Sequence, residues 1–253
     1  ALDAAGIGPG VEVIVPAISF VSTATAVSRS GAVPVFVDIE PYTFNIDPAL
    51  IEKAVTNRTK AIIPVHLFGQ PCDMDPILAV AKRHGLKVIE DCAQAFGARY
   101  KGRVVGTLGD AACFSFFPSK NLACYGDGGM VITGDDATDA TLRMLRNHGS
   151  SVRYYHDLLG YNSRLDEIQA AVVRVKLKRI DAFNEGRRRA AALYRKHIRR
   201  NDVTLPSEAE GRHHVYHQFT ILTDRRDQLQ EALSRSGIAS AVYYPVPLHR
   251  QEV

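Results

Sequence analysis

Two residues, Lys120 and Asp91, are of types that can do chemistry together, and both close apolar runs. Lys120 follows the run AACFSFF at 111–117, and Pro118 ends a strand there because proline cannot donate to a sheet ladder. Burying an ammonium without a partner is costly. A lysine held in a mostly apolar site therefore has a lowered pKa, and its neutral amine becomes a nucleophile that can form a Schiff base. Asp91 closes the run KVIED at 87–91, where its carboxylate could hold a positive charge opposite that amine.

Pyridoxal phosphate is a cofactor that needs such a pair. Its aldehyde takes a lysine, and a carboxylate keeps its pyridinium nitrogen protonated so that the ring can act as an electron sink. Its phosphate needs hydroxyls and backbone amides, and Ser115 and Ser119 flank the lysine closely. The alternative is a lysine that emerges from a strand into solvent and pairs with Asp127 or a helix terminus. From the chemistry alone both interpretations stay open.

Alternating apolar runs and helical stretches must position this pair. Strand–helix–strand units whose strands are apolar on both faces predict an α/β fold, a mostly parallel sheet sandwiched by helices. Ligands bind beyond the carboxyl ends of the strands in such sheets, which is where Asp38, Asp91 and Lys120 fall. The expected strands cover 11–18, 34–39, 60–68, 87–93, 110–116 and 128–134, and the expected helices cover 21–30, 48–55, 75–84 and 136–147.

After residue 135 the sequence changes character. A polar, aromatic-rich loop at 147–164 has a length that is usually functional or disordered inside a compact domain. We expect a large cofactor-binding domain at 1–180 and the start of a smaller α+β domain at 181–253. Both ends stop abruptly, so we expect the N-terminal part of the first domain and the rest of the second to be missing. The elements expected in this part are helices at 165–197 and 225–236 and strands at 214–222 and 238–246.

The composition excludes several classes of protein. Of 253 residues, 46% are hydrophobic and 23% charged, an ordinary globular balance. The net charge is +4, and the densest basic run, RRR at 187–189, is typical of a solvated helix face rather than of nucleic-acid binding. The four cysteines, Cys72, Cys92, Cys113 and Cys124, form no CxxC pair, so we expect reduced thiols in a cytoplasmic protein, with no disulfide frame and no metal site. No apolar segment reaches the ~18–20 residues that span a membrane, and no signal peptide is visible.

Ordered motifs carry a resemblance to a known family. EDCAQAFGARYKG (90–102), GDAACFSFFPSKNL (109–122) and GDGGMV (126–131) resemble the DegT/StrS family of pyridoxal-phosphate-dependent sugar aminotransferases, which have the fold type I architecture. The match runs along essentially the whole chain in collinear order. Further stretches that agree are GIGPGVEVIVPAISFVSTATAV (6–27), HLFGQPCDMDPI (66–77), RNHG (146–149), LGYNSRLDEIQAAVVRVKL (159–177), HVYHQF (214–219) and YPVPLH (244–249).

The resemblance implies a role for five residues. Lys120 forms the Schiff base with the cofactor and later moves the proton, and Asp91 pairs with the pyridinium nitrogen. Gln94 lies by the ring and its 3-hydroxyl, and Ser115 hydrogen-bonds the phosphate. Asn162 reaches the phosphate of the other subunit's cofactor, which implies a homodimer with shared active sites. On residue type alone, Gln94 could equally be an ordinary polar residue at a helix start, and Asn162 a loop cap.

The resemblance also implies the activity. The expected reaction is transamination from glutamate to a keto-sugar, in the first instance a nucleotide-linked keto-deoxyhexose, in amino-sugar biosynthesis. Lysine at 120 separates this sequence from deoxygenating relatives, which carry histidine there. An aminocyclitol-type aminotransferase is the close alternative, and a non-catalytic, cofactor-binding regulatory homologue is the alternative from another class.

Two departures from the family pattern bear on these expectations. Relatives have a Gly-Thr or Gly-Ser turn before the helix that here starts at Ala1, and its backbone amides cradle the cofactor phosphate at a helix N-terminus. That turn is absent from this sequence, which is the only support for the regulatory alternative. Tyr243 stands where relatives often have histidine, so substrate contacts cannot be carried over there.

Overall fold

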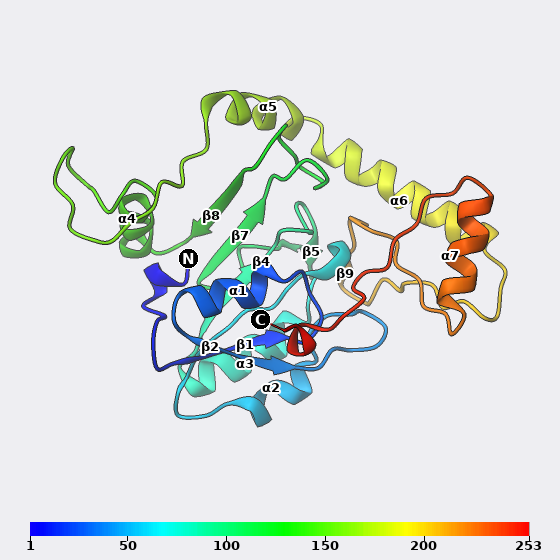
Figure 1. Cartoon of the computed structure of the whole chain (residues 1–253), viewed down its shortest axis with the longest axis horizontal. Helices are drawn as coiled ribbons and strands as arrows, with labels where there is room; N and C mark the ends of the chain where they lie inside the picture. The colour runs from blue at the N-terminus through cyan, green and yellow to red at the C-terminus, as the bar shows by residue number, and fades with distance from the viewer. Residues whose placement is uncertain (253) are drawn as a thin grey trace.

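A six-stranded sheet forms the centre of the computed structural model, which describes residues 1–252 (Figure 1). The strand order is β2-β1-β3-β4-β7-β8, and every neighbouring pair is parallel except β7 with β8. This architecture confirms the predicted α/β class. The strands are β1 (Glu12–Pro16), β2 (Val33–Val37), β3 (Thr59–Ile62), β4 (Lys87–Asp91), β7 (Ala111–Ser115) and β8 (Gly129–Thr133).

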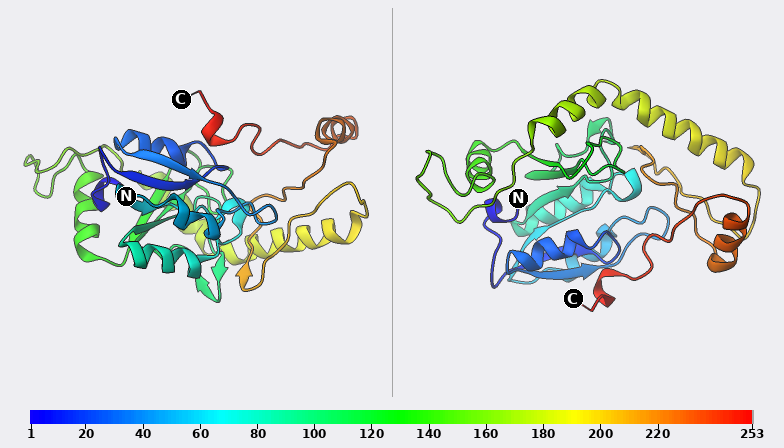
Figure 2. Two further views of the ribbon diagram at one scale, coloured as in Figure 1. Left: turned by 90° about the horizontal axis from the view of Figure 1, so that it is seen from below. Right: turned by 45° about the horizontal axis from the view of Figure 1, so that its top comes forward.

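The sheet is covered on both faces, as the apolar strands predict. In β1, Val13 and Val15 pack into one core with Val27 of α1 (Ser22–Arg29), whereas Ile14 packs into another with α2 (Pro48–Ala54) and α3 (Met74–His84). Successive residues of a strand point to opposite faces, so one apolar run can feed both cores. The left view of Figure 2 shows α1 above the sheet and α2 and α3 beneath it.

Local signals explain where several helices begin and end. The carboxylate of Asp47 caps α2 by accepting the amide of Ala49, and Pro48 occupies the first helical position. Gly85, with φ of 63°, ends α3 in the left-handed conformation that glycine adopts without strain. The remaining short elements of this part are η1 (Asp3–Ala5) and η2 (Leu67–Gly69).

The second half of the chain runs away from the sheet. The helix expected at 165–197 is two helices, α5 (Glu167–Leu177) and α6 (Ile180–His197), because Arg179 leaves helical geometry at φ −119° and ψ 4°. In Figure 1, α6 extends from the sheet towards α7 (Arg226–Arg235), and the chain then returns to the edge of β1. The other elements are α4 (Asp136–Leu145), η3 (Leu248–Arg250) and a small sheet of β5 (Arg99–Tyr100), β6 (Arg103–Val104) and β9 (Arg212–His213).

Three expected strands are wrong in whole or in part. The run 60–68 leaves the ladder after Ile62 because Pro64 has no amide hydrogen to donate. Residues 214–222 are not a strand within the described chain, since the amides of Val215 and Gln218 bind the turn at 68–69 and Tyr216 has φ of 44°. Residues 238–246 are also irregular, and Pro245 in this segment would interrupt any ladder.

The contacts of the segment after α6 bear on the domain organisation. β9 pairs with β5, and Val215 is fully buried in the core that lies under β7. Part of the segment assigned to the second domain therefore packs on the first. The boundary between residues 180 and 181 stays a prediction.

Glu90, the residue before the end of β4, anchors the neighbouring loops. Its side chain is fully buried and accepts hydrogen bonds from the amides of Gly106, Leu108 and Gly109 at 2.8 Å each. His66 Nδ1 accepts the amide of Cys72, so Nε2 carries the hydrogen and donates it to Glu90 at 3.0 Å. One carboxylate thus holds the loop after β3 and the loop before β7 to the end of β4.

We expect Glu90→Gln to lower the free energy of unfolding by about 3–5 kcal/mol, because buried donors lose a charged acceptor. Burial by itself raises the pKa of Glu90, but the hydrogen bonds from His66, Gly106 and Gly109 bring it below its ordinary value. A lowered folded-state pKa contributes stability above the unfolded pKa, and this contribution is lost as pH falls through the folded value. Denaturant unfolding of both proteins from pH 7 to pH 3 should show the difference shrinking below about pH 4.5.

Glu52→Gln is the matched control, because Glu52 makes an exposed ion pair with Arg83. Exposed pairs contribute little, so this variant should unfold like the wild type. Equal losses in the two variants, or a Glu90→Gln loss independent of pH, would contradict the role assigned to Glu90.

Candidate functional site

Asp91 lies at the carboxyl end of β4, in the middle of the sheet, with both carboxylate oxygens engaged. Oδ1 accepts the amide of Ala93 at 3.1 Å, and Oδ2 accepts the hydroxyl of Thr23 at 3.0 Å. Thr23 comes from the first turn of α1, the helix that follows the carboxyl end of β1. The carboxylate is therefore held from two directions.

Lys120 follows β7, the neighbour of β4, on a short turn. Its amide donates to the carbonyl of Phe117 at 2.9 Å, and its side chain is half-buried. Burial lowers the pKa of Lys120, and the nearby Asp91 carboxylate opposes part of that shift. The structure thus brings the predicted lysine and aspartate together. The amine of Lys120 becomes neutral at lower pH than the amine of an exposed lysine.

The turn that carries Lys120 is fixed by the side chain of Asn121. Its Nδ2 donates to Asn184 Oδ1 of α6 at 2.8 Å and to the carbonyl of Val215 at 3.3 Å. Its Oδ1 accepts Nδ1–H of His217 at 3.0 Å. Burial, with smaller effects from Lys120 and Arg187, lowers the pKa of His217 to about 3, so this imidazole is neutral beside the amine.

Ser115 ends β7 on the same edge of the sheet. The parallel register pairs Asp91 with Cys113, which places Ser115 two residues beyond the level of Asp91. Its Oγ accepts the amide of Phe117 at 3.3 Å. Within residues 1–252 the hydroxyl hydrogen has no acceptor, so it can be donated to a ligand.

Gln94 is buried, and the orientation of its amide is settled by two partners. Its Oε1 accepts the amide of Phe68 at 2.7 Å, and its Nε2 donates to the hydroxyl of Tyr244 at 2.9 Å. One Nε2 hydrogen remains for a ligand. Burial raises the pKa of Tyr244 to about 12, so its phenol is neutral and can accept this hydrogen bond.

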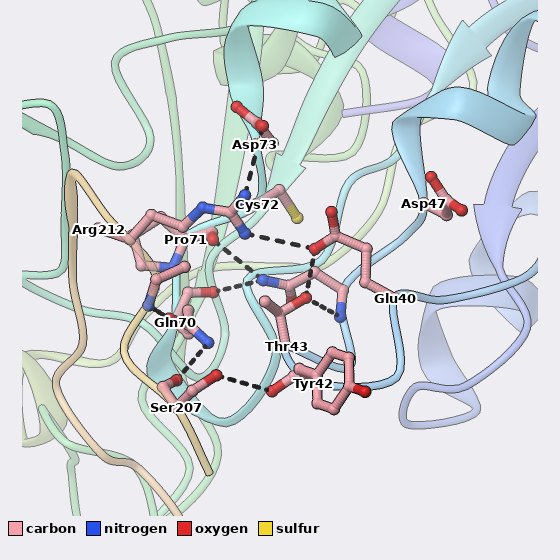
Figure 3. A network of polar contacts seen from close by, with 12 residues as sticks. Glu40, Tyr42, Thr43, Asp47, Gln70, Pro71, Cys72, Asp73, Ser207 and Arg212 are labelled. Atoms are coloured by element: carbon pink, nitrogen blue, oxygen red, sulfur yellow. Dashed lines mark hydrogen bonds and ion pairs between the residues drawn. The ribbon is translucent and has the colours of Figure 1, made fainter.

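The turn that presents Phe68 to Gln94 is itself held by a polar network (Figure 3). Arg212 is nearly buried and reaches Glu40 at 3.5 Å and Asp73 at 3.3 Å. Gln70 donates to the carbonyl of Ser207 at 3.1 Å and accepts the amide of Ala209 at 2.8 Å. The network ties the loop after β2, the turn after η2 and the segment before β9 into one unit.

Asn162 lies apart from the other four predicted residues. It is exposed on the loop between α4 and α5, where it forms an isolated bridge with Asn147 and accepts Nε of Arg164 at 3.2 Å. Within the described chain it contacts none of Asp91, Gln94, Ser115 and Lys120. One chain thus assembles four of the five predicted residues.

The sequence interpretation missed Thr23, His217 and Tyr244. Each belongs to a segment far along the chain from its partner, and neither threonine nor tyrosine in an apolar stretch signals a site. His217 and Tyr244 lie in the motifs HVYHQF and YPVPLH, so the motifs marked the segments without marking the contacts.

A group of potential metal ligands, His66, Glu90 and Cys92, lies next to Asp91. Both ring nitrogens of His66 are hydrogen-bonded, and Glu90 accepts three amides besides. Burial raises the pKa of the Cys92 thiol well above its usual range, which keeps it protonated and a poor ligand. We assign this group to the framework that supports β4.

The helices built by residues 1–252 include none that combines the length and the apolarity needed to cross a membrane.

Comparisons with known proteins identify the relatives of this chain. The sequence profile of the DegT/DnrJ/EryC1/StrS aminotransferase family matches residues 1–253. A "Pleiotropic regulatory protein" of Geobacillus stearothermophilus is 58% identical over 256 residues, covering 100% of this chain and 69% of the relative. A UDP-N-acetyl-3-dehydro-alpha-D-glucosamine 3-aminotransferase of Acidithiobacillus ferrooxidans is 56% identical over 253 residues, with the same coverage of 100% and 69%. Among solved structures, DesV of S. venezuelae in complex with a ketimine intermediate superposes with a TM-score of 0.97 at 48% identity, over 99% of this chain and 68% of DesV.

We expect Lys120 to react with small reagents that modify amines at lower pH than an exposed lysine does, because burial lowers its pKa. Lys101 is the internal reference, since its hydrogen bond to Asp75 raises its pKa. Reductive methylation across pH 6–11, read by peptide mass spectrometry, should give a half-maximal rate at lower pH for Lys120. Asp91→Asn should shift the Lys120 profile lower still, because it removes the charge that raises this pKa. A Lys120 profile at or above that of Lys101 would contradict the electrostatic environment described here.

Proposed function

The chain belongs to the DegT/DnrJ/EryC1/StrS aminotransferase family, and from that premise we propose that it moves an amino group from glutamate to a nucleotide-linked keto-sugar through the site around Lys120. It is a pyridoxal-phosphate-dependent aminotransferase of amino-sugar biosynthesis. The observation that carries the assignment of the site is the half-buried Lys120, with a lowered pKa, beside the Asp91 carboxylate.

The residues at the carboxyl edge of β4 and β7 fit the cofactor. When bound, pyridoxal phosphate supplies an aldehyde that takes up the amino group and a ring that withdraws electrons from the reacting carbon. Lys120 offers the amine, and Asp91 offers a carboxylate that is already oriented by Thr23 and Ala93. Gln94 and Ser115 each keep one hydrogen that no residue of 1–252 accepts, which suits the 3-hydroxyl oxygen and the phosphate.

Each residue then has a task during amino transfer. Lys120 Nζ, in its neutral form, would move a proton between the reacting carbon of the substrate and the cofactor carbon that carries the amino group, in one direction with the donor and in the other with the acceptor. Asp91 would hold the ring nitrogen in its protonated form. Neutral His217 adds no positive charge beside the amine, so it does not lower the pKa of Lys120 further.

The relatives support the nature of the acceptor. The Acidithiobacillus relative is named for a UDP-linked sugar with a keto group at carbon 3, and it is 56% identical to this chain. We take a nucleotide-linked sugar with a 3-keto group as the first substrate to test. An aminocyclitol precursor is the alternative acceptor, and glutamate is the donor we expect for either.

We further propose a homodimer with shared sites. Its support is the exposed Asn162 together with apolar side chains left open on α5, where Ile168 is 75% and Val175 67% exposed. These two residues are seven apart and therefore lie on one face of the helix. A second copy of the chain would cover this face and bring its own Asn162 to the phosphate.

A regulatory homologue without turnover is the second candidate, favoured by the name of the Geobacillus relative. Both candidates would bind the cofactor, so binding alone does not separate them. Amino transfer does, since a regulatory protein would show none with any keto-sugar.

Lys120→Ala is expected to abolish the visible absorption band of the bound cofactor and to lower the rate of amino transfer at least about 10³-fold. The measurement is incubation with glutamate and a panel of nucleotide keto-sugars, including a UDP-linked 3-keto-sugar, read by mass spectrometry. Lys101→Ala, which removes an exposed lysine, should retain wild-type absorbance and rate. A wild-type protein that binds the cofactor but transfers no amino group to any acceptor would favour the regulatory candidate. Absence of the absorption band from the wild type would contradict the assignment of the cofactor site itself.

A further inference from the structure

A chain of hydroxyl groups leads from α1 to Asp91. Ser19 Oγ lies 3.0 Å from Thr23 Oγ1, and Thr23 Oγ1 lies 3.0 Å from Asp91 Oδ2. The carboxylate can only accept, so Thr23 donates its single hydroxyl hydrogen to Asp91. Thr23 must then accept from Ser19, which fixes the direction of the chain as Ser19 to Thr23 to Asp91.

Burial makes this arrangement difficult to rearrange. Ser19 is 3% and Thr23 4% exposed, so water is not a ready substitute for either partner. A buried hydroxyl that loses its acceptor carries the full cost of its desolvation. Thr23 is also β-branched and helical, which restricts the rotation of its side chain.

The two donors to Asp91 come from different parts of the fold. Ala93 N follows β4 and belongs to the same segment as Asp91, so it moves with it. Thr23 belongs to α1, a separate helix that packs on one face of the sheet. Among residues 1–252, the bond from Thr23 is the one hydrogen bond that ties the carboxylate to a second element, and it therefore sets the plane of the carboxylate.

We infer that Thr23 is a positioning residue for Asp91, which orients the carboxylate towards the protonated ring nitrogen of the cofactor. This role rests on the proposed function, because the ring nitrogen is the group that Asp91 serves there. Thr23 acts through Asp91 and not through contact with the substrate. Ser19 supports it by occupying the second site of the Thr23 hydroxyl.

The test compares Thr23→Val, which keeps the shape and removes the hydroxyl, with Thr23→Ser, which restores it. Thr23→Val should weaken pyridoxal phosphate binding about tenfold, because a hydrogen bond to a charged group is lost. Thr23→Ser should bind within about threefold of the wild type. Thr25→Val makes the same chemical change two residues along α1, where the threonine bonds neither Ser19 nor Asp91, and should bind like the wild type.

The second arm uses the 1-deaza analogue of the cofactor, in which a C–H group replaces the ring nitrogen. If Thr23 acts through Asp91 on that nitrogen, wild type and Thr23→Val should bind the analogue equally well. An equal loss with cofactor and analogue would mean that Thr23 has only a structural role, and it would overturn the inference. So would a Thr23→Val protein that binds the cofactor like the wild type, and in both cases the aminotransferase assignment stands, since it depends on Lys120. A wild-type protein that binds cofactor and analogue with equal affinity would overturn the role of Asp91 and, with it, that of Thr23.

Discussion

The parallel pairing of β4 with β7 is the constraint on which the site depends. This pairing places the end of β4, with Asp91, beside the end of β7, with Ser115 and the turn to Lys120. The alternation of side chains along β4 then separates two adjacent acids. Glu90 points into the core, where it accepts four hydrogen bonds, and Asp91 points to the edge, where Thr23 holds it. A shift of one residue in this strand would exchange the two carboxylates and lose both the anchor and the site.

The electrostatics of the site follow from burial more than from ion pairs. Lys120, His217 and Tyr244 all have pKa values shifted towards their neutral forms, in each case chiefly because they are withdrawn from water. Asp91 favours the charged form of Lys120 without reversing the shift. The amine thus reaches its neutral form at lower pH than an exposed lysine does, which suits a group that must act as a nucleophile and as a proton carrier.

The sequence predicted the parts of the site that depend on local pattern. Apolar runs ended by Asp91 and by Pro118 identified two neighbouring strand ends, and the family motifs pointed to Gln94 and Ser115. The sequence did not predict the contacts between distant segments. Thr23 is 68 residues from Asp91 and Gln94 is 150 residues from Tyr244, and only the folded sheet brings them together. The expected strand at 214–222 failed for the same reason, because the amides of Val215 and Gln218 bind the turn at 68–69 and not a neighbouring strand. For Asn162 the single chain does not test the prediction, because it gives the position of this residue on an exposed loop but not the other subunit that it is expected to contact.

Several segments of the fold hold the backbone amide of Phe68 in the position from which it binds Gln94. Phe68 has φ of 56°, a left-handed conformation that costs on the order of 1 kcal/mol or more for a residue other than glycine. In this conformation its amide reaches Gln94, and the turn is held by Val215 N on the carbonyl of Gly69 and by Asn45 Oδ1 on the amide of Leu67. The Arg212 network closes the same turn from outside. Strain at one residue is therefore offset by bonds from three segments, and its effect is that Gln94 carries its amide in one orientation before any ligand arrives.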